Sequence, residues 1–280
     1  MVARRRPMNY RPAPGGRSGG GGRLLIALVM VAIALFSYFS SSVFNPVTGE
    51  NQHISITPRQ EIALGLQALP EMMQQFGGEY PDPALQKYID EVGQRLVQSS
   101  AAKETEWQFD FHLLRDPETI NAFALPGGQV FITAALYQQF TTEGQLAGVL
   151  GHEIGHVVAR HGAQRIAKQE LTEGLTGAVV VASGDARTAQ MAAMIGNMVN
   201  MKYGRDDELQ SDKLGVRFMS EAGYDPRAMI DVMKILASAR GGAEQPEFFS
   251  THPNPENRIA RIEEAIAELF PNGVPEGLEK

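Results

Sequence analysis

The longest apolar run of the chain lies near its N-terminus and is long enough to cross a membrane. Residues 24–36 contain no polar side chain, and no charged residue occurs between Arg23 and Glu50. The stretch from Leu24 to Phe44 has 21 residues, and about 20 apolar residues span a bilayer as a helix. We therefore predict a transmembrane anchor over residues 24–44. A cleaved signal sequence is the alternative interpretation, because its apolar core has a similar length.

Downstream of this run, apolar residues recur mainly at helical spacing. The segment Thr57-Pro58-Arg59-Gln60 has the residues of a helix start, with Thr at the N-cap, Pro at the first helical position and Gln at the third. Asp82-Pro83 predicts a second start, and Thr142 with Gln145 a third, whose helix we expect to end at Gly162. Further helices are expected over 163–172, 187–202, 205–222, 226–239 and 255–269.

Three short segments before residue 134 have the character of strands. Residues 107–113 alternate apolar and polar side chains, and residues 120–125 and 129–133 flank the turn Pro126-Gly127-Gly128. No internal repeat interrupts this order. The pattern predicts one α+β domain, mostly helical, with a small β-sheet near its start.

Two later segments, 174–182 and 189–201, are apolar and rich in Gly, Ala and Met. Each is too short to span a membrane. We interpret them as core helices. A mobile cover over the functional site, or contact with the membrane surface, is the alternative.

Charge is distributed unevenly along the chain. Six of the 25 basic residues and none of the 32 acidic residues lie in residues 1–23. The rest of the chain is therefore acidic and lacks the basic footprint of a nucleic-acid-binding protein. The basic segment is rich in Gly and Pro, and we interpret it as a disordered cytoplasmic tail. Positive charge on the cytoplasmic side of the anchor places the remaining chain outside the cytoplasm.

The chain has no cysteine, so any metal site must be built from histidine and carboxylate. With 43% hydrophobic and 20% charged residues, the composition is that of a globular protein. The predicted organisation is a tail, an anchor, a linker, a folded domain and a C-terminal tail, over residues 1–23, 24–44, 45–56, 57–270 and 271–280.

The clearest chemical signal is an HExxH pattern, His152-Glu153-Ile154-Gly155-His156, inside the helix that begins near Thr142. Residues four apart lie about 40° from each other around a helix, so both imidazoles can bind one tetrahedral metal ion. Glu153 is not needed as a ligand. It is placed to take a proton from water and to return it to a leaving amine.

Such a site needs a third protein ligand. Glu208 and Asp212 lie four apart on a predicted helix, so one can bind the metal while the other orients a ligand imidazole. A solvated acidic face is the alternative. His161 lies nine residues after His152, half a turn around the helix, and is expected to face away from the metal as a structural or surface residue. Two further histidines are poor ligands by position, namely His53 and His112.

Four segments, in their order along the chain, resemble the HtpX and CAAX prenyl protease family of zinc metallopeptidases, peptidase family M48, which includes BepA-type and Oma-type proteases. They are HEIGHVVARHG at 152–162, ELQSD at 208–212, NAFALPGGQVFIT at 121–133 and STHPNPENRI at 250–259. The resemblance covers about residues 57–270. It implies a gluzincin-type metalloprotease domain that binds one zinc ion per chain.

The resemblance also implies roles for single residues. The zinc ligands would be His152, His156 and Glu208, with Glu153 as the general base and Asp212 as the partner of a ligand histidine. His252 and Arg258 match the C-terminal motif, are candidate catalytic residues and would lie near the cleft. For His252, oxyanion stabilisation, a zinc cap in a resting state and a structural role stay open as alternatives.

The segment after residue 120 would be an edge strand that holds an extended substrate by strand addition. Its candidate contacts are Asn121, Ala122, Phe123, Gly127 and Gly128.

The sequence therefore predicts a membrane-tethered zinc endopeptidase that hydrolyses unfolded or damaged envelope and membrane proteins. Its partners would be a flexible polypeptide and the membrane through residues 24–44, with no nucleic acid. The expected location is the inner membrane, with the catalytic domain on the periplasmic side.

HtpX and the prenyl proteases have several membrane spans and BepA carries helical repeats, so this chain departs from both. The alternatives are an envelope chaperone or assembly factor with a latent or structural zinc site, and a tethered binding module with a chance HExxH.

Overall fold

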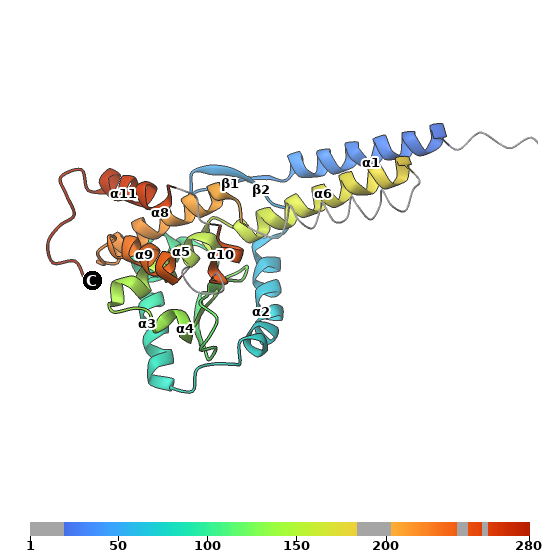
Figure 1. Ribbon diagram of the computed structural model, residues 1–280. Helices are drawn as coiled ribbons and strands as arrows, with labels where there is room; N and C mark the ends of the chain where they lie inside the picture. Colours follow the sequence, from blue (N-terminus) through green and yellow to red (C-terminus); the bar gives the residue numbers. More distant parts are fainter. Residues whose placement is uncertain (1–19, 184–202, 240–245, 254–256) are drawn as a thin grey trace, which may run out of the picture.

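A computed structural model describes residues 20–183, 203–239, 246–253 and 257–280. Two helices, α1 (Gly20–Ser40) and α6 (His161–Ser183), lie side by side and extend away from a compact body (Figure 1). The body holds the other helices and a small sheet. Within the described residues, α1 is the one helix with the length and apolar composition of a membrane span, and few of its residues are buried.

The helices that begin the body start where the sequence predicts. Helix α2 (Pro58–Gln75) has a capping box in which Thr57 accepts a hydrogen bond from the Gln60 backbone, and the Gln60 side chain accepts one from the Thr57 backbone. Helix α3 (Pro83–Ser99) begins after Asp82, whose carboxylate accepts hydrogen bonds from two backbone amides. Residues 101–104 then form a short 3₁₀-helix, η1.

The main sheet has three strands in the order β3-β5-β4. Strands β3 (Asp110–Leu114) and β5 (Gln129–Thr133) are parallel, and β4 (Ala122–Ala124) runs antiparallel to β5. The prediction that the segment after Asn121 is an edge strand is therefore confirmed. The short helix α4 (Ala134–Tyr137) follows β5.

Helix α5 (Glu143–Val158) forms the centre of the body and is buried along almost its whole length. It packs closely against α8 (Arg205–Glu221), because glycines leave no side chain between the helices. A Cβ at Gly155 would lie 3.0 Å from the Ser211 carbonyl oxygen, and one at Gly151 would lie 3.4 Å from the Gly215 Cα. This close approach brings the acidic residues of α8 to the HExxH face of α5.

The remaining helices close the body on the C-terminal side of the chain. They are α9 (Ala228–Ala239), α10 (Phe248–Thr251) and α11 (Arg258–Leu269). The buried apolar side chains of α3, α5, α8, α9 and α11 form one continuous core with those of β3 and β5. The segment 271–280 folds back onto this body, where the Asp225 amide donates to the Glu279 carbonyl and Arg95 pairs with the Glu279 carboxylate at 2.5 Å.

The predicted linker is the first difference from expectation. Residues 42–53 form an antiparallel hairpin of β1 (Ser42–Asn45) and β2 (Glu50–His53) instead of an irregular segment. The Asn45 amide donates to the Val158 carbonyl and the Gln52 amide to the Ala159 carbonyl, each at 2.8 Å. These buried polar contacts satisfy carbonyls at the end of α5, and the pattern of apolar residues gives no sign of them.

The second difference is where α5 ends. The chain turns at Arg160, which has φ 55°, and α6 begins at His161, so α5 ends at Val158 and not at Gly162. The helix expected over 163–172 and the apolar segment 174–182 are parts of α6, which is not a core helix. The helix expected over 187–202 and the segment 189–201 lie outside the described residues.

Candidate active site

Helix α5 presents both histidines of the HExxH pattern on one buried face. The Nε2 atoms of His152 and His156 lie 3.1 Å apart, and both side chains are almost fully buried. Helix α8 adds Glu208, whose two carboxylate oxygens lie 3.5 Å from His152 Nε2 and 3.4 Å from His156 Nε2. The structure therefore brings together the three residues expected to bind metal.

His252, directly after α10, supplies a fourth donor atom. Its Nδ1 lies 3.1 Å from a Glu208 oxygen and 3.4 Å from His152 Nε2. The imidazole is fully buried and stacks on the ring of Phe248, with ring centroids 4.5 Å apart. The structure therefore places this residue beside the expected metal ligands.

These four side chains fit a metal ion. One donor atom from each of His152, His156, Glu208 and His252 lies within 4.8 Å of the others. Tetrahedral zinc with nitrogen ligands at 2.0–2.1 Å separates its ligand atoms by roughly 3.3 Å. The contacts of 3.1–3.5 Å described above match that separation. Glu208 Oε2 is buried without a hydrogen-bond partner, and the Arg258 guanidinium lies 3.2 Å from it. The fit therefore rests on the set of nitrogen and oxygen donors and on their spacing.

Asp212 and Arg258 support His152 from behind. Asp212 Oδ1 lies 2.9 Å from His152 Nδ1, as expected for the partner of a ligand histidine. The Arg258 guanidinium binds both Asp212 oxygens, at 2.6 and 2.8 Å, and its Nη1 lies 3.2 Å from a Glu208 oxygen. Burial and the Arg258 cation each lower the pKa of His152, but the Asp212 and Glu208 carboxylates outweigh them and raise it to about 9.

Glu153 lies next to this cluster but outside it. Its side chain is fully buried, and neither carboxylate oxygen has a hydrogen-bond partner. His252 Nε2 is 3.6 Å from Glu153 Oε1. Burial raises the pKa of Glu153, which favours its uptake of a proton. A buried acid without a hydrogen-bond partner, beside a cluster that could bind a metal, has the properties of a general base.

Of the two roles expected for His161, structural or surface, the structure supports the structural one. The residue is buried, and its Nδ1 lies 2.9 Å from His156 Nδ1, so it contacts the cluster from behind and is no surface residue. The sequence argument assumed one continuous helix, whereas the turn at Arg160 redirects the chain. His53 and His112 lie outside the cluster, as expected; His112 is nevertheless buried and contacts Gln129.

Tyr203 packs against the cluster, although no sequence motif assigns it a role. Its ring lies over His156, with centroids 4.1 Å apart, and the Arg165 guanidinium covers it at 4.8 Å. Burial raises the pKa of Tyr203 to about 12, so the ring stays neutral. Its place two residues before the acidic helix was the only signal in the sequence.

The candidate substrate-binding residues fall into two groups. Asn121, Ala122 and Phe123 belong to the edge of the sheet, and the first two are buried. Gly127 and Gly128 instead form a buried turn at φ +87° and +117°, where a Cβ would lie within 2.7 Å of the backbone of Ile62 or Gln108. Close packing requires glycine at both positions.

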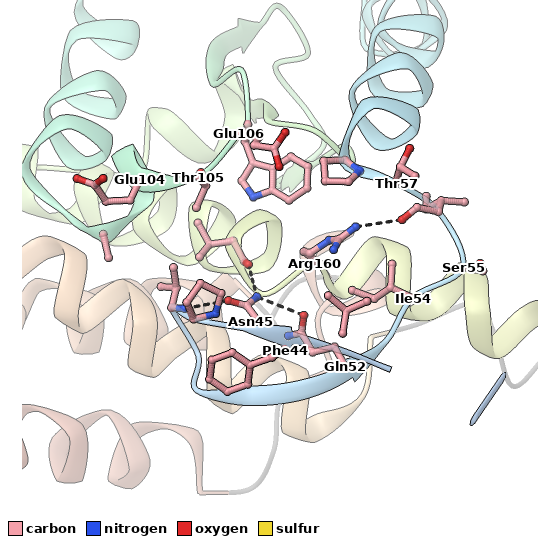
Figure 2. Close-up of a pocket in the computed structure, with 18 of the residues that line it drawn as sticks. Phe44, Asn45, Gln52, Ile54, Ser55, Thr57, Glu104, Thr105, Glu106 and Arg160 are labelled. Atoms are coloured by element: carbon pink, nitrogen blue, oxygen red, sulfur yellow. Dashed lines mark hydrogen bonds between the residues drawn. The ribbon is translucent and has the colours of Figure 1, made fainter. Parts of the chain in front are cut away.

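Within the part of the chain that the structure describes, the side chains of the cluster are almost fully buried. A cavity of about 10 Å³ beside His156 is lined by Leu125, Pro126 and Tyr203, which is room for about one water molecule. A larger groove of about 740 Å³ lies at the C-terminal end of α5 (Figure 2). It is lined by the β1–β2 hairpin, Trp107 and Arg160 and includes no residue of the cluster.

Comparison with known proteins agrees with this geometry. The profile of Peptidase family M48 matches residues 83–266. The beta-barrel assembly-enhancing protease of Escherichia coli (strain K12) is 32% identical over 261 residues, which cover 88% of this chain and 52% of that protein. The mitochondrial metalloendopeptidase OMA1 of Schizosaccharomyces pombe is 30% identical over 238 residues, or 82% and 68% of the two chains. The corresponding protein of Bos taurus is 26% identical over 251 residues, or 83% and 47%. The chain thus spans about half the length of the bacterial relatives it matches.

Proposed function

This chain belongs to peptidase family M48, and from that premise we propose that it is a membrane-tethered, zinc-dependent endopeptidase. Its proposed substrates are unfolded or damaged envelope and membrane proteins. The proposed location is the inner membrane, with α1 as the anchor and the body on the periplasmic side. The observation that carries the proposal is the buried carboxylate of Glu153, which has no hydrogen-bond partner and lies next to four converging donor atoms.

We assign the metal to His152, His156 and Glu208. Histidine and carboxylate without cysteine suit zinc, and the resemblance of the motifs favours zinc over other divalent ions. When bound, zinc supplies Lewis-acid polarisation of the scissile carbonyl and acidifies water. Asp212 accepts a hydrogen bond from His152 Nδ1 and so directs the opposite ring nitrogen, Nε2, at the metal.

The proton transfers belong to Glu153. Its raised pKa lets the carboxylate take a proton from the attacking water and pass it to the leaving amine. Arg258 contacts Asp212 and Glu208 and acts in this scheme as a positioning residue, although its motif suggested a catalytic one. Strand β4 lies at the sheet edge, where an extended substrate can pair with it through backbone hydrogen bonds.

His252 supports a second candidate function. Its Nδ1 completes a set of four donors, as in a closed structural zinc site, whereas catalysis requires an open position. A peptidase must therefore displace His252 before substrate binds. If the closed set is permanent, the protein is an envelope chaperone or assembly factor with a latent site. A structural zinc site has no use for a buried, non-ligand carboxylate, so the presence of Glu153 argues against this second function.

The test compares the full-length protein, in detergent and with zinc, with its Glu153→Gln variant. We expect the parent to cleave casein, and the variant to be slower by about 10²- to 10⁴-fold, since general acid–base catalysis contributes that much. Both should hold one zinc per chain by elemental analysis. Glu91→Gln removes an exposed carboxylate on α3 and should leave the rate unchanged.

Each other outcome has a definite meaning. If neither parent nor Glu153→Gln cleaves while both hold zinc, the latent assembly factor replaces the peptidase. If the parent holds no metal, a tethered binding module becomes the favoured function. Equal cleavage by parent and variant would remove Glu153 from the role of base.

A further inference from the structure

Helices α1 and α6 form an antiparallel pair that extends away from the body (Figure 1). The contact is close because α6 carries small residues where it meets α1. A Cβ at Gly174 would lie 2.7 Å from the Ala34 Cβ, and one at Gly177 would lie 3.2 Å from the Met30 Cε. Ala27 and Ala178 are both almost fully buried. The position of α6 along the anchor is thus fixed by specific contacts.

The composition of α6 changes along its length. Its first half carries Lys168, Glu170 and Glu173, and no charged residue occurs between Glu173 and Asp185. The uncharged half, Gly174–Ser183, reads GLTGAVVVAS, and Val179 on it is 50% exposed. A water-exposed helix would present polar residues on that side.

The register places this uncharged half beside the most apolar part of α1. Gly174 lies level with Ala34, six residues before the end of α1 at Ser40. Since both helices advance about 1.5 Å per residue, Ser183 lies level with Leu25, next to Arg23. Glu173, Glu170 and Lys168 lie nearer the body, level with Leu35, Tyr38 and Ser40 of α1 respectively.

The neighbouring surface of α1 is strongly apolar. Its large side chains are exposed over the same levels, with Ile33 at 62%, Val29 at 49% and Leu28 at 58%. Only 6% of the apolar window of α1 is buried within the protein. The exposed faces of the two helices therefore form one continuous apolar surface.

We propose that Gly174–Ser183 of α6 is embedded in the lipid bilayer beside α1, so that the chain enters the membrane with two helices and not one. The occupant of the apolar surface is lipid hydrocarbon. Ten residues cover about 15 Å, half the hydrocarbon thickness, and α1 supplies the rest of the span. The small residues between the helices are typical of membrane helix pairs. The inference rests on the proposed anchoring through α1 and not on proteolysis.

The test uses the absence of native cysteine. Single cysteines are introduced as Val179→Cys, Ile33→Cys and Gln169→Cys, labelled with the fluorophore NBD, and the full-length protein is reconstituted into phosphatidylcholine vesicles. Ile33 is the reference for α1, and Gln169 is the matched control, exposed on α6 ten residues before Val179. Quenching is measured with doxyl-labelled lipid and with iodide on vesicles opened by freezing and thawing.

We expect the label at position 179 to behave like the label at position 33, with blue-shifted emission, strong quenching by doxyl lipid and loss of quenching by iodide. The label at position 169 should show the reverse.

Quenching of position 179 by iodide while position 33 stays in lipid would overturn the inference and keep the anchor. Quenching of both by iodide would overturn the anchor and the inference together. Protection of position 179 from both quenchers would mean that protein covers this face, for example a second copy of the chain. Casein cleavage is not a readout, so failure of the proposed peptidase activity is distinguished from failure here.

Discussion

At the scale of single residues, the properties of His152 are set by its neighbours. Asp212 fixes its Nδ1, Arg258 holds Asp212 in place, and Glu208 lies beside its Nε2. With a pKa of about 9 the metal-free imidazole is protonated at neutral pH, and that proton must leave before Nε2 can bind a metal. The carboxylates therefore hold the ring in position before the metal arrives.

Replacing Asp212 with Asn tests this arrangement. The Asp212→Asn variant keeps the shape of the side chain but removes the charge that orients His152 and pairs with Arg258. Loss of such a partner typically weakens metal binding by about 10- to 100-fold. The measurement is zinc affinity by competition with a chelator, on protein whose circular dichroism shows that it is folded. Asp231→Asn, at an exposed ion pair on α9, should bind zinc like the parent. An unchanged affinity in Asp212→Asn would contradict the role of Asp212.

The residues that sequence analysis brought together are those whose positions depend on helical periodicity alone. His152 and His156 share a face for that reason, and so do Glu208 and Asp212. His161 does not follow the rule, since Arg160 at φ 55° ends the period. Tyr203 reaches His156 only through tertiary folding. A single sequence contains the periodicity but not the path of the chain between helices.

At the scale of elements, glycine decides which helices and strands can touch. Gly93 on α3 faces the ring of Phe111 on β3, where a Cβ would lie 2.4 Å from the nearest ring carbon. Gly148 on α5 has ordinary space, with its nearest neighbour, the Met229 Cα, at 3.4 Å. The two positions are both helical, and they differ in the room that the opposing element leaves.

These two glycines give a matched pair of substitutions. We expect Gly93→Ala to lower the free energy of unfolding by about 1–3 kcal/mol, since overpacking a core costs that much. Gly148→Ala should be neutral or stabilising by up to about 1 kcal/mol, because alanine is the better helix former. Urea unfolding of the full-length protein in detergent measures both. A Gly93→Ala variant as stable as the parent would show that α3 and β3 can move apart without cost.

Element starts were predictable where local chemistry determines them. The caps at Thr57 and Asp82 satisfy backbone amides within three residues, and both are confirmed. The β1–β2 hairpin was missed because it depends on Asn45 and Gln52, which bond to carbonyls more than 100 residues away. The length of α6 was missed because its second half packs against α1, a contact between segments far apart in the sequence.

At the scale of the whole molecule, the site is built from parts of the chain up to 100 residues apart. His152, Glu208 and His252 come from α5, α8 and the segment after α10. A metal bound to all three would join these elements, and metal binding would therefore contribute to the stability of the fold.

Metal removal should lower the stability of the whole body. At zinc concentrations of 100 times the dissociation constant, binding stabilises the folded state by about 2.7 kcal/mol. We expect a chelator to lower the thermal midpoint of the full-length protein and zinc to restore it. Glu153→Gln should show the same shift, since Glu153 is no ligand, and His156→Ala should show much less. Equal midpoints with and without zinc in the parent would contradict a bound metal.

Helix α6 also sets the distance between the site and the membrane. It begins at His161, which contacts His156, and on the proposed placement its Lys168 lies level with Ser40, the last residue of α1. The seven residue steps from His161 to Lys168 advance about 10 Å along the helix axis. An extended chain covers that distance in about three residues. A membrane-spanning substrate would meet the site only at the residues just outside the bilayer. Cleavage positions would then be selected by their distance from the lipid, and only weakly by the side chains at the cut.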